Sequence, residues 1–353
     1  MEAGLSRLLA FLGSNFENSS VSTHSPTDRL VIGANLDGLA CALDARRAGE
    51  SVLLVDAAPR PGGRIQTQRS EGFVCEYGPF ALPRSEWDAL AQKLRRPPSA
   101  VGLQPGAENG FYWNGRERLQ TPVGGDPVSG TGGLEDLVTA FRRELDDTSL
   151  NAEGASEPVL QLGREVTALE PGDNGVLNAT LGGESPRTVT ARAVDLFIPL
   201  DRAARLLAPL DQALPDLCAR FVREPEAMCF LGFSTNAAVA TATAGYGMVV
   251  EEMAEPLDGV EEVLFCTSIY PRRAQPGKSL VRVAFAGDIA TGSDEELLDR
   301  SRRVLLHAFG LADAPIFFRC NRSSRPIRDS VDLECRVRLR ALDRMMPTLR
   351  WRG

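Results

Sequence analysis

Residues 31–64 read VIGANLDGLACALDARRAGESVLLVDAAPRPGGR, and they combine two kinds of local pattern. An apolar stretch ends at Ile32, and a glycine turn and a run with leucine and alanine at helical spacing follow it. Gly49 ends that run, and a second apolar stretch, residues 51–55, leads to Asp56. This order of strand, glycine turn, helix, strand and acidic residue predicts a Rossmann-type βαβ unit. The acidic residue of such a unit normally binds an adenosine ribose.

The phosphate end of this unit departs from the usual pattern G-x-G-x-x-G. The chain has GANLDG at residues 33–38, so Asn35 replaces the glycine that lets the backbone approach a pyrophosphate. Asp37 adds a negative charge in the first helical turn, and a like charge at about 5 Å costs roughly 3 kcal/mol at an effective dielectric of about 20. We therefore expect Asn35 or Asp37 to cap the helix. We expect dinucleotide binding at this turn to be weak or absent.

Composition limits the possible partners. The 353 residues are 43% hydrophobic and 24% charged, as in soluble globular proteins with ample core. The net charge of −8 argues against nucleic-acid binding, because phosphate contacts need a basic patch. The sequence has no apolar run near the ~20 residues that a membrane span needs, so no transmembrane segment is predicted.

Cysteine and histidine give no metal or catalytic signature. The seven cysteines are dispersed without a C-x-x-C pair, so we expect reduced thiols in a cytoplasmic chain. The two histidines, His24 and His307, lie far apart and support neither a zinc site nor a Ser-His-Asp arrangement. No metal ligand is predicted.

The chain before the first strand is expected to lie outside the main fold. Residues 1–29 comprise a short amphipathic helix and a polar linker, and the apolar stripe of the helix consists of Leu5, Leu8, Leu9, Leu12 and Phe16. The helix either folds back onto the body or docks on a protein partner or a membrane surface. We expect residues 30–120 to form the Rossmann-like half and residues 121–353 to form the rest of the fold.

Two longer blocks resemble one enzyme family. APRPGGRIQTQRSEGFVCEYGPF, residues 58–80, resembles the "GGRI-T----GF--E-GP" segment of the FAD-dependent protoporphyrinogen oxidase and flavin amine oxidase family. Residues 245–287 are similar to that family's "GFG … SSIFP-RAP-G--LL-VF-GG" block, and residues 164–170 and 193–200 resemble strands on the adenine side of its cofactor. The resemblance implies an α/β fold with a Rossmann-like FAD/NAD(P)-binding part and a second lobe with a mixed sheet.

The resemblance also implies which residues would contact FAD if FAD is bound. They are Gly33, Gly38, Asp56, Gly62, Gly63 and Arg64. The first two glycines would shape the pyrophosphate turn, the aspartate would hold the ribose, and the last three would flank the phosphates and the ribityl chain. No catalytic residue is assigned, because in this family the flavin carries out the hydride chemistry.

Four departures from the family affect the expected function. They are Asn35, a connection between residues 122 and 132 too short for the family's helical substrate domain, a stretch at 323–330 without aromatic residues, and an end at Gly353 before the C-terminal flavin segment. They predict a non-catalytic relative that acts as a subunit or scaffold of a larger assembly. The alternatives are an active FAD-dependent oxidoreductase acting on a tetrapyrrole or an amine, and a module that binds a nucleotide or tetrapyrrole without redox chemistry.

Overall fold

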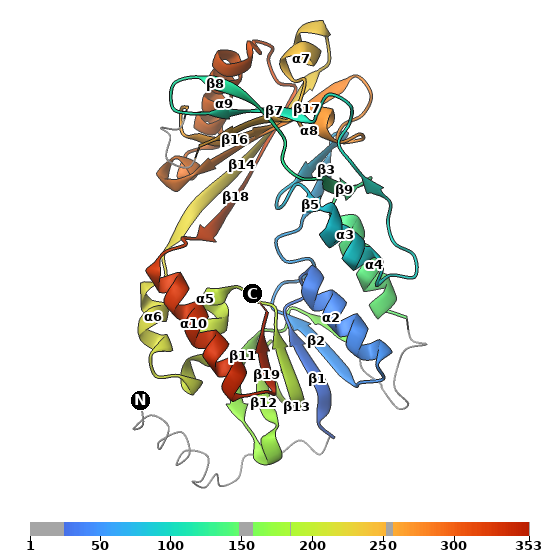
Figure 1. Ribbon diagram of the computed structural model, residues 1–353, viewed down its shortest axis with the longest axis vertical. Helices are drawn as coiled ribbons and strands as arrows, with labels where there is room; N and C mark the ends of the chain where they lie inside the picture. Colours follow the sequence, from blue (N-terminus) through green and yellow to red (C-terminus); the bar gives the residue numbers. More distant parts are fainter. Residues whose placement is uncertain (1–24, 148–157, 184, 252–256, 353) are drawn as a thin grey trace.

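The computed structural model describes residues 25–147, 158–183, 185–251 and 257–352. They form two lobes, each built around one seven-stranded sheet, and the lobes follow one another along the longest axis (Figure 1). The expected N-terminal helix and His24 lie outside the described residues.

The first sheet is largely parallel and has the order β10-β2-β1-β13-β12-β11, with β19 paired to the end of β13. Strands β10, β2, β1, β13 and β19 run parallel, so their carboxyl ends meet at one edge, which faces the second lobe in Figure 1. The expected βαβ unit is confirmed. The strands are β1 (Thr27–Ile32), β2 (Val52–Asp56), β10 (Leu160–Leu162), β11 (Val166–Pro171), β12 (Leu177–Leu181), β13 (Arg187–Leu196) and β19 (Leu349–Trp351).

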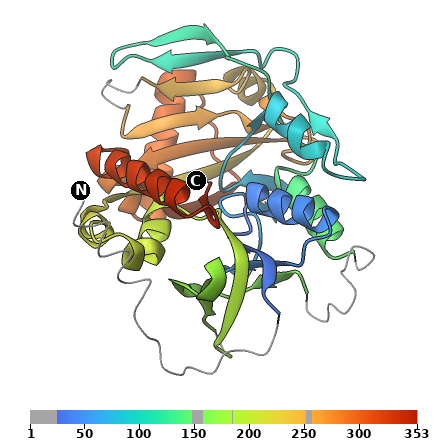
Figure 2. The ribbon, with the colours of Figure 1, turned by 60° about the horizontal axis from the view of Figure 1, so that its bottom comes forward.

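Helices cover both faces of this sheet because its central strands are apolar on both sides. Leu30 and Ile32 of β1 pack in one core with α5, α6 and α10, whereas Val31 packs in a second core with α2, α3 and α4. Figure 2 shows α10 and α2 on opposite sides of the chain end. The helices are α2 (Leu36–Arg47), α3 (Arg84–Ala91), α4 (Glu135–Leu145), α5 (Leu200–Leu207), α6 (Leu214–Arg220) and α10 (Ser330–Met345).

The second sheet is mixed, in the order β18-β14-β17-β16-β15-β7-β8, and only its β15–β7 pair is parallel. Side chains of β14 alternate between two cores: Cys229 and Leu231 pack toward α9, and Phe230 packs with the β3–β4 hairpin. The elements are β7 (Asn109–Trp113), β8 (Arg118–Pro122), β14 (Arg223–Ser234), α7 (Ala237–Ala242), β15 (Gly247–Val250), β16 (Val260–Leu264), α8 (Cys266–Ile269), β17 (Lys278–Ala286), α9 (Asp294–Phe309) and β18 (Phe317–Pro326).

Short elements join the lobes. They are β3 (Thr67–Ser70), β4 (Phe73–Glu76), β5 (Leu82–Pro83), β6 (Ala100–Val101) and β9 (Pro127–Gly130). The 3₁₀ turns lie within single lobes: η2 (Asp173–Gly175) and η3 (Ala208–Leu210) in the first, and η4 (Gly287–Thr291) in the second. As expected, the chain runs from β8 through β9 into α4 without an intervening helical domain.

The linear division expected at residue 120 does not separate the two sheets. Strands β7 and β8 precede or span this point and pair in the second sheet, whereas β10 to β13 follow it and belong to the first. The physical reason is that strands distant in sequence pair with each other in both sheets. Among the described residues, no helix is long and apolar enough to cross a membrane.

Candidate functional site

The turn at the carboxyl end of β1 is closely packed against its own chain. Gly33 has a φ of 107°, and a Cβ there would lie 2.4 Å from the carbonyl oxygen of Phe197. A Cβ on Gly38 would lie 1.9 Å from the carbonyl oxygen of Gly33. Both glycines are therefore required by the packing of β1, α2 and the end of β13, whether or not a ligand is present.

Asn35, one of the two residues expected to cap α2, is its N-cap. Its Oδ1 accepts a hydrogen bond from the Gly38 amide at 2.9 Å, and its Nδ2 donates to the Phe197 carbonyl at 3.1 Å. The amides of Leu36 and Asp37 make no hydrogen bond within the described part of the chain. The side chain thus takes one first-turn donor and leaves two that can bind an anion.

Asp37 lies exposed beside an open cleft of about 660 Å³. Glu86 of α3 and Arg352 after β19 line the same cleft. Burial and the charge of Asp37 raise the pKa of Glu86. Because water screens an exposed carboxylate, the roughly 3 kcal/mol expected for repulsion of a phosphate is an upper limit.

Asp56 lies at the carboxyl end of β2, where the sequence places it. Its two oxygens accept hydrogen bonds from the amides of Ala34 at 2.7 Å and Ala58 at 2.8 Å. Each carboxylate oxygen has two acceptor positions, so the side chain can still accept from a ribose hydroxyl. Its position is fixed by the same loops that would border the ligand.

The Gly62–Gly63 loop lies against the N-terminus of α2. The Gly62 amide donates to the Ala34 carbonyl at 2.7 Å, and a Cβ on Gly63 would come 3.0 Å from the Cβ of Asn35. Arg60, which sequence reasoning missed, holds this loop by donating to the carbonyls of Ile65 at 2.8 Å and Gly63 at 3.0 Å. The structure thus brings the glycines of both motifs together.

Arg64 leaves this loop toward the second lobe, and its guanidinium lies 3.2 Å from Glu226 of β14. The two side chains border a cavity of about 430 Å³, here called the interlobe cavity. Its lining residues are Arg64, Gly78, Pro79, Glu226, Ala227, Met228, Glu261, Glu262, Arg282, Ala284, Phe285 and Arg325. Arg64 is thus the one expected site residue that contacts the second sheet through its side chain.

Ion pairs dominate the polar wall of the interlobe cavity. Arg282 lies 2.6 Å from Glu262, and Arg325 lies 2.7 Å from Glu261. The stretch at 323–330 borders the cavity through Arg325, and Ser323 of the same stretch donates to Glu226 at 3.1 Å. These charged residues were not predicted, because only the pairing of β14, β16, β17 and β18 brings them together.

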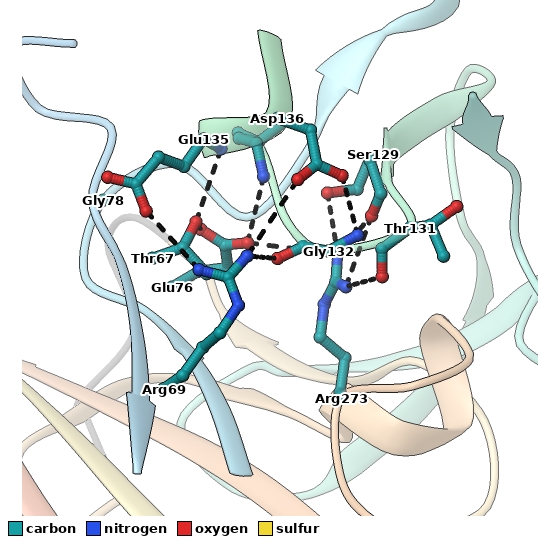
Figure 3. Close-up of polar contacts among 12 residues, drawn as sticks. Thr67, Arg69, Glu76, Gly78, Ser129, Thr131, Gly132, Glu135, Asp136 and Arg273 are labelled. Carbon is teal, nitrogen blue, oxygen red and sulfur yellow. Dashed lines mark hydrogen bonds and ion pairs between the residues drawn. The ribbon is translucent and has the colours of Figure 1, made fainter. Parts of the chain in front are cut away.

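A buried polar cluster holds the two lobes next to the cavity (Figure 3). Glu76 accepts hydrogen bonds from the Thr67 hydroxyl at 2.9 Å and the Leu134 amide at 3.1 Å, and it lies 4.0 Å from Arg273. Arg273, fully buried, also donates to the Ser129 hydroxyl at 2.8 Å. Burial raises the pKa of Glu76 to about 7, although Arg273 and the two hydrogen bonds oppose this rise.

This cluster positions the cavity through the segment that follows Glu76. A Cβ on Gly78 would lie 1.9 Å from the carbonyl oxygen of Arg64, and Arg282 donates to the Gly78 carbonyl at 3.1 Å. Glu76 is part of the family-like segment, but its partner could not be foreseen from that segment alone. The described residues contain no group of acidic, cysteine or histidine side chains suited to a metal ion.

Two segments of the sequence match the models of known protein families. Residues 31–94 match the model of the NAD(P)-binding Rossmann-like domain, and residues 91–328 match that of flavin containing amine oxidoreductases. The second match covers most of the chain. The protein therefore belongs to the flavin containing amine oxidoreductase family.

Individual relatives agree with this class. The L-amino-acid oxidases of Daboia russelii and Lachesis muta are 35% identical over 112 and 113 residues, which is 29% and 31% of this chain. These matches span only 21% of either oxidase. A putative protoporphyrinogen oxidase from Exiguobacterium sp. 255-15 has the same fold, with a TM-score of 0.73, 16% identity, and 93% and 94% of the two chains covered. The structure of putrescine oxidase bound to putrescine is similar as well, with a TM-score of 0.67 and 14% sequence identity over 93% of each chain.

Proposed function

We propose that this chain is an FAD-dependent oxidoreductase that acts on a cationic amine in the interlobe cavity. The observation that carries the proposal is the position of the Gly62–Arg64 loop. It runs from the N-terminus of α2, where dinucleotide phosphates bind in Rossmann folds, to a cavity with three carboxylates in its wall. The family match and the amine oxidase relatives support the same function.

The residues at the carboxyl edge fit a dinucleotide. The free amides of Leu36 and Asp37 and the guanidinium of Arg64 would bind its phosphates, and Asp56 would hold its ribose. Asn35 directs its amide onto Gly38 and Phe197, so the backbone donors beside it remain open. When bound, FAD would supply the two-electron acceptor for oxidation of a carbon–nitrogen bond.

The cavity wall fits an amine better than a neutral substrate. Glu226 and Glu262 each pair with an arginine, and either carboxylate would bind a substrate ammonium in place of that arginine. Met228 and Phe285 would cover the carbon chain of the substrate and exclude water. Because Arg282 and Arg325 remain in the same wall, a substrate that also carries a carboxylate would find a partner for each charge.

The test is whether amines reduce the bound flavin. FAD-loaded protein is mixed without oxygen with amines, amino acids or alcohols of matched carbon skeleton, and flavin absorbance is followed. We expect bleaching by amines and not by the alcohols, and a higher KM for Glu226→Gln than for Glu117→Gln, which removes an exposed carboxylate outside the cavity. Loaded protein that no amine or amino acid reduces would refute the proposed activity.

A non-catalytic subunit of a larger assembly is the second candidate. The observation in its favour is Asn35, whose Cβ and amide stand where the family has a glycine and satisfy one first-turn donor without a phosphate. This candidate predicts a colourless protein with no flavin absorption bands. The family match supports the oxidoreductase better.

A further inference from the structure

Cys229 and Cys320 lie directly opposite each other on neighbouring strands. They are in register on the antiparallel strands β14 and β18, and their sulfur atoms are 3.5 Å apart. Residues in such pairs have Cα atoms about 4.5–5.5 Å apart, within the range of about 4.4–6.8 Å found for disulfides. Rotation of two side chains can therefore bring the sulfurs to bonding distance without moving either strand.

The two thiols differ in access. β18 is the edge strand of the second sheet, and Cys320 is partly exposed there, whereas Cys229 on the adjacent strand is fully buried. No other cysteine–cysteine hydrogen bond occurs within the described ranges. A small oxidant can thus reach the outer sulfur, and the inner sulfur is in contact with it.

The pKa values of the two thiols also differ, and the more exposed thiol has the lower one. The hydrogen bond from the Cys229 thiol and the nearby Arg322 guanidinium lower the pKa of Cys320. That hydrogen bond and burial raise the pKa of Cys229. Cys320 is therefore the thiol that forms the nucleophilic thiolate, and Cys229 is the one that keeps its proton.

We propose that Cys229 and Cys320 form a reversible disulfide when the protein meets hydrogen peroxide. The Cys320 thiolate attacks one peroxide oxygen, the O–O bond breaks, and the released hydroxide takes a proton to become water. The Cys229 sulfur then attacks the resulting sulfenic acid, the S–O bond breaks, and hydroxide leaves with the Cys229 proton as a second water. Overall, two thiols and one peroxide give one disulfide and two waters.

The disulfide would act next to the interlobe cavity. Further along the same strand pair, Glu226 lies opposite Ser323, and these two residues share a hydrogen bond at the cavity wall. A covalent bond between β14 and β18 would fix their register beside that wall. The oxidant is supplied from outside, so this inference does not depend on the proposed flavin function.

The experiment treats the folded chain with hydrogen peroxide, blocks the remaining thiols with N-ethylmaleimide in denaturant, because Cys229 is buried in the folded protein, and maps the peptides by mass spectrometry. We expect loss of two of the seven alkylatable thiols, a mass decrease of two hydrogen atoms, one linked peptide pair containing Cys229 and Cys320, and recovery with dithiothreitol. Oxidation of Cys320 to sulfinic acid with Cys229 still alkylated would overturn the inference, as would no thiol loss or a link between other cysteines.

Variants separate the two steps. Cys229→Ser should leave a sulfenic acid on Cys320 that dimedone traps, and Cys320→Ser should protect Cys229 from oxidation. Cys335→Ser, a buried cysteine of the other lobe, is the matched control and should form the disulfide as the wild type does. If Cys229 were still oxidised in Cys320→Ser, the inference would be wrong. The wild-type peptide map remains decisive even if a variant does not fold.

Discussion

At the scale of single residues, Asn35 combines two effects that substitutions can separate. Its amide caps α2, and its Cβ occupies the place of the glycine that usually approaches a pyrophosphate. Loss of an asparagine cap costs about 1 kcal/mol when alanine replaces it and a few tenths when glycine does. The two substitutions therefore differ chiefly in whether a Cβ remains beside the phosphates.

We expect Asn35→Gly to bind FAD about tenfold more tightly than Asn35→Ala, a difference of about 1.4 kcal/mol. The reason is that only the glycine removes the Cβ. Titration of FAD into stripped protein, followed by flavin fluorescence, gives both dissociation constants. Equal constants would show that the Cβ does not border the ligand.

Glu76 makes the stability of the fold dependent on pH. Its folded pKa of about 7 lies above its ordinary value of 4.5, so between these values the folded protein keeps a proton that the unfolded chain loses. The stabilisation from Glu76 is therefore complete below about pH 4.5 and is lost as the pH rises through about 7, with an upper limit of about 3 kcal/mol.

Glu76→Gln should flatten this pH dependence, because glutamine stays neutral. Urea unfolding from pH 5 to pH 8 should show a smaller loss of free energy of unfolding in the variant than in the wild type. Glu117→Gln, at an exposed turn, controls for removal of one carboxylate. A slope unchanged by Glu76→Gln would contradict the assignment.

At the scale of elements, the local sequence signal located α2, whose cap is local. Asn35 or Asp37 was expected to cap this helix, and Asn35 does so, because the donor it satisfies is three residues away. The glycine motif and the apolar strands likewise predicted the βαβ unit. The polar wall of the interlobe cavity could not be predicted, because its residues are distant in sequence. Pairing of β14 with β18 brings Glu226 beside Arg325, and Arg64 reaches Glu226 from the glycine loop of the other lobe.

α9 provides a test of such a local signal. Ser293 accepts from the Glu296 amide at 3.2 Å, and Glu296 accepts from the Ser293 amide at 2.8 Å, which forms a capping box. Ser293→Ala should lower the free energy of unfolding by about 1 kcal/mol, and Ser293→Asp should largely retain it. Urea denaturation measures both, and equal losses would show that the cap hydrogen bond is not responsible.

At the scale of the whole molecule, the two lobes meet through contacts of two kinds. The Glu76–Arg273 cluster is buried and fixes the segment beside Arg64, whereas the Arg64–Glu226 pair is open to solvent on the arginine side. Exposed ion pairs contribute about 0–1 kcal/mol, so the second contact matters little for stability.

Arg64→Ala should therefore change the melting temperature little but weaken FAD binding clearly, since the arginine would contact the phosphates and ribityl chain. Arg84→Ala, which breaks an exposed ion pair with Asp126 away from the site, should leave FAD affinity unchanged. Thermal unfolding with and without FAD separates the two effects. An Arg64→Ala protein with full FAD affinity would remove this residue from the binding site.

The most direct measurement is the flavin content of the purified chain. Protein produced with added FAD is freed of unbound cofactor, its visible spectrum is recorded, and released FAD is quantified after denaturation. We expect flavin absorption bands and stoichiometric FAD. A colourless protein whose melting temperature does not rise with FAD would contradict the account and favour the non-catalytic subunit.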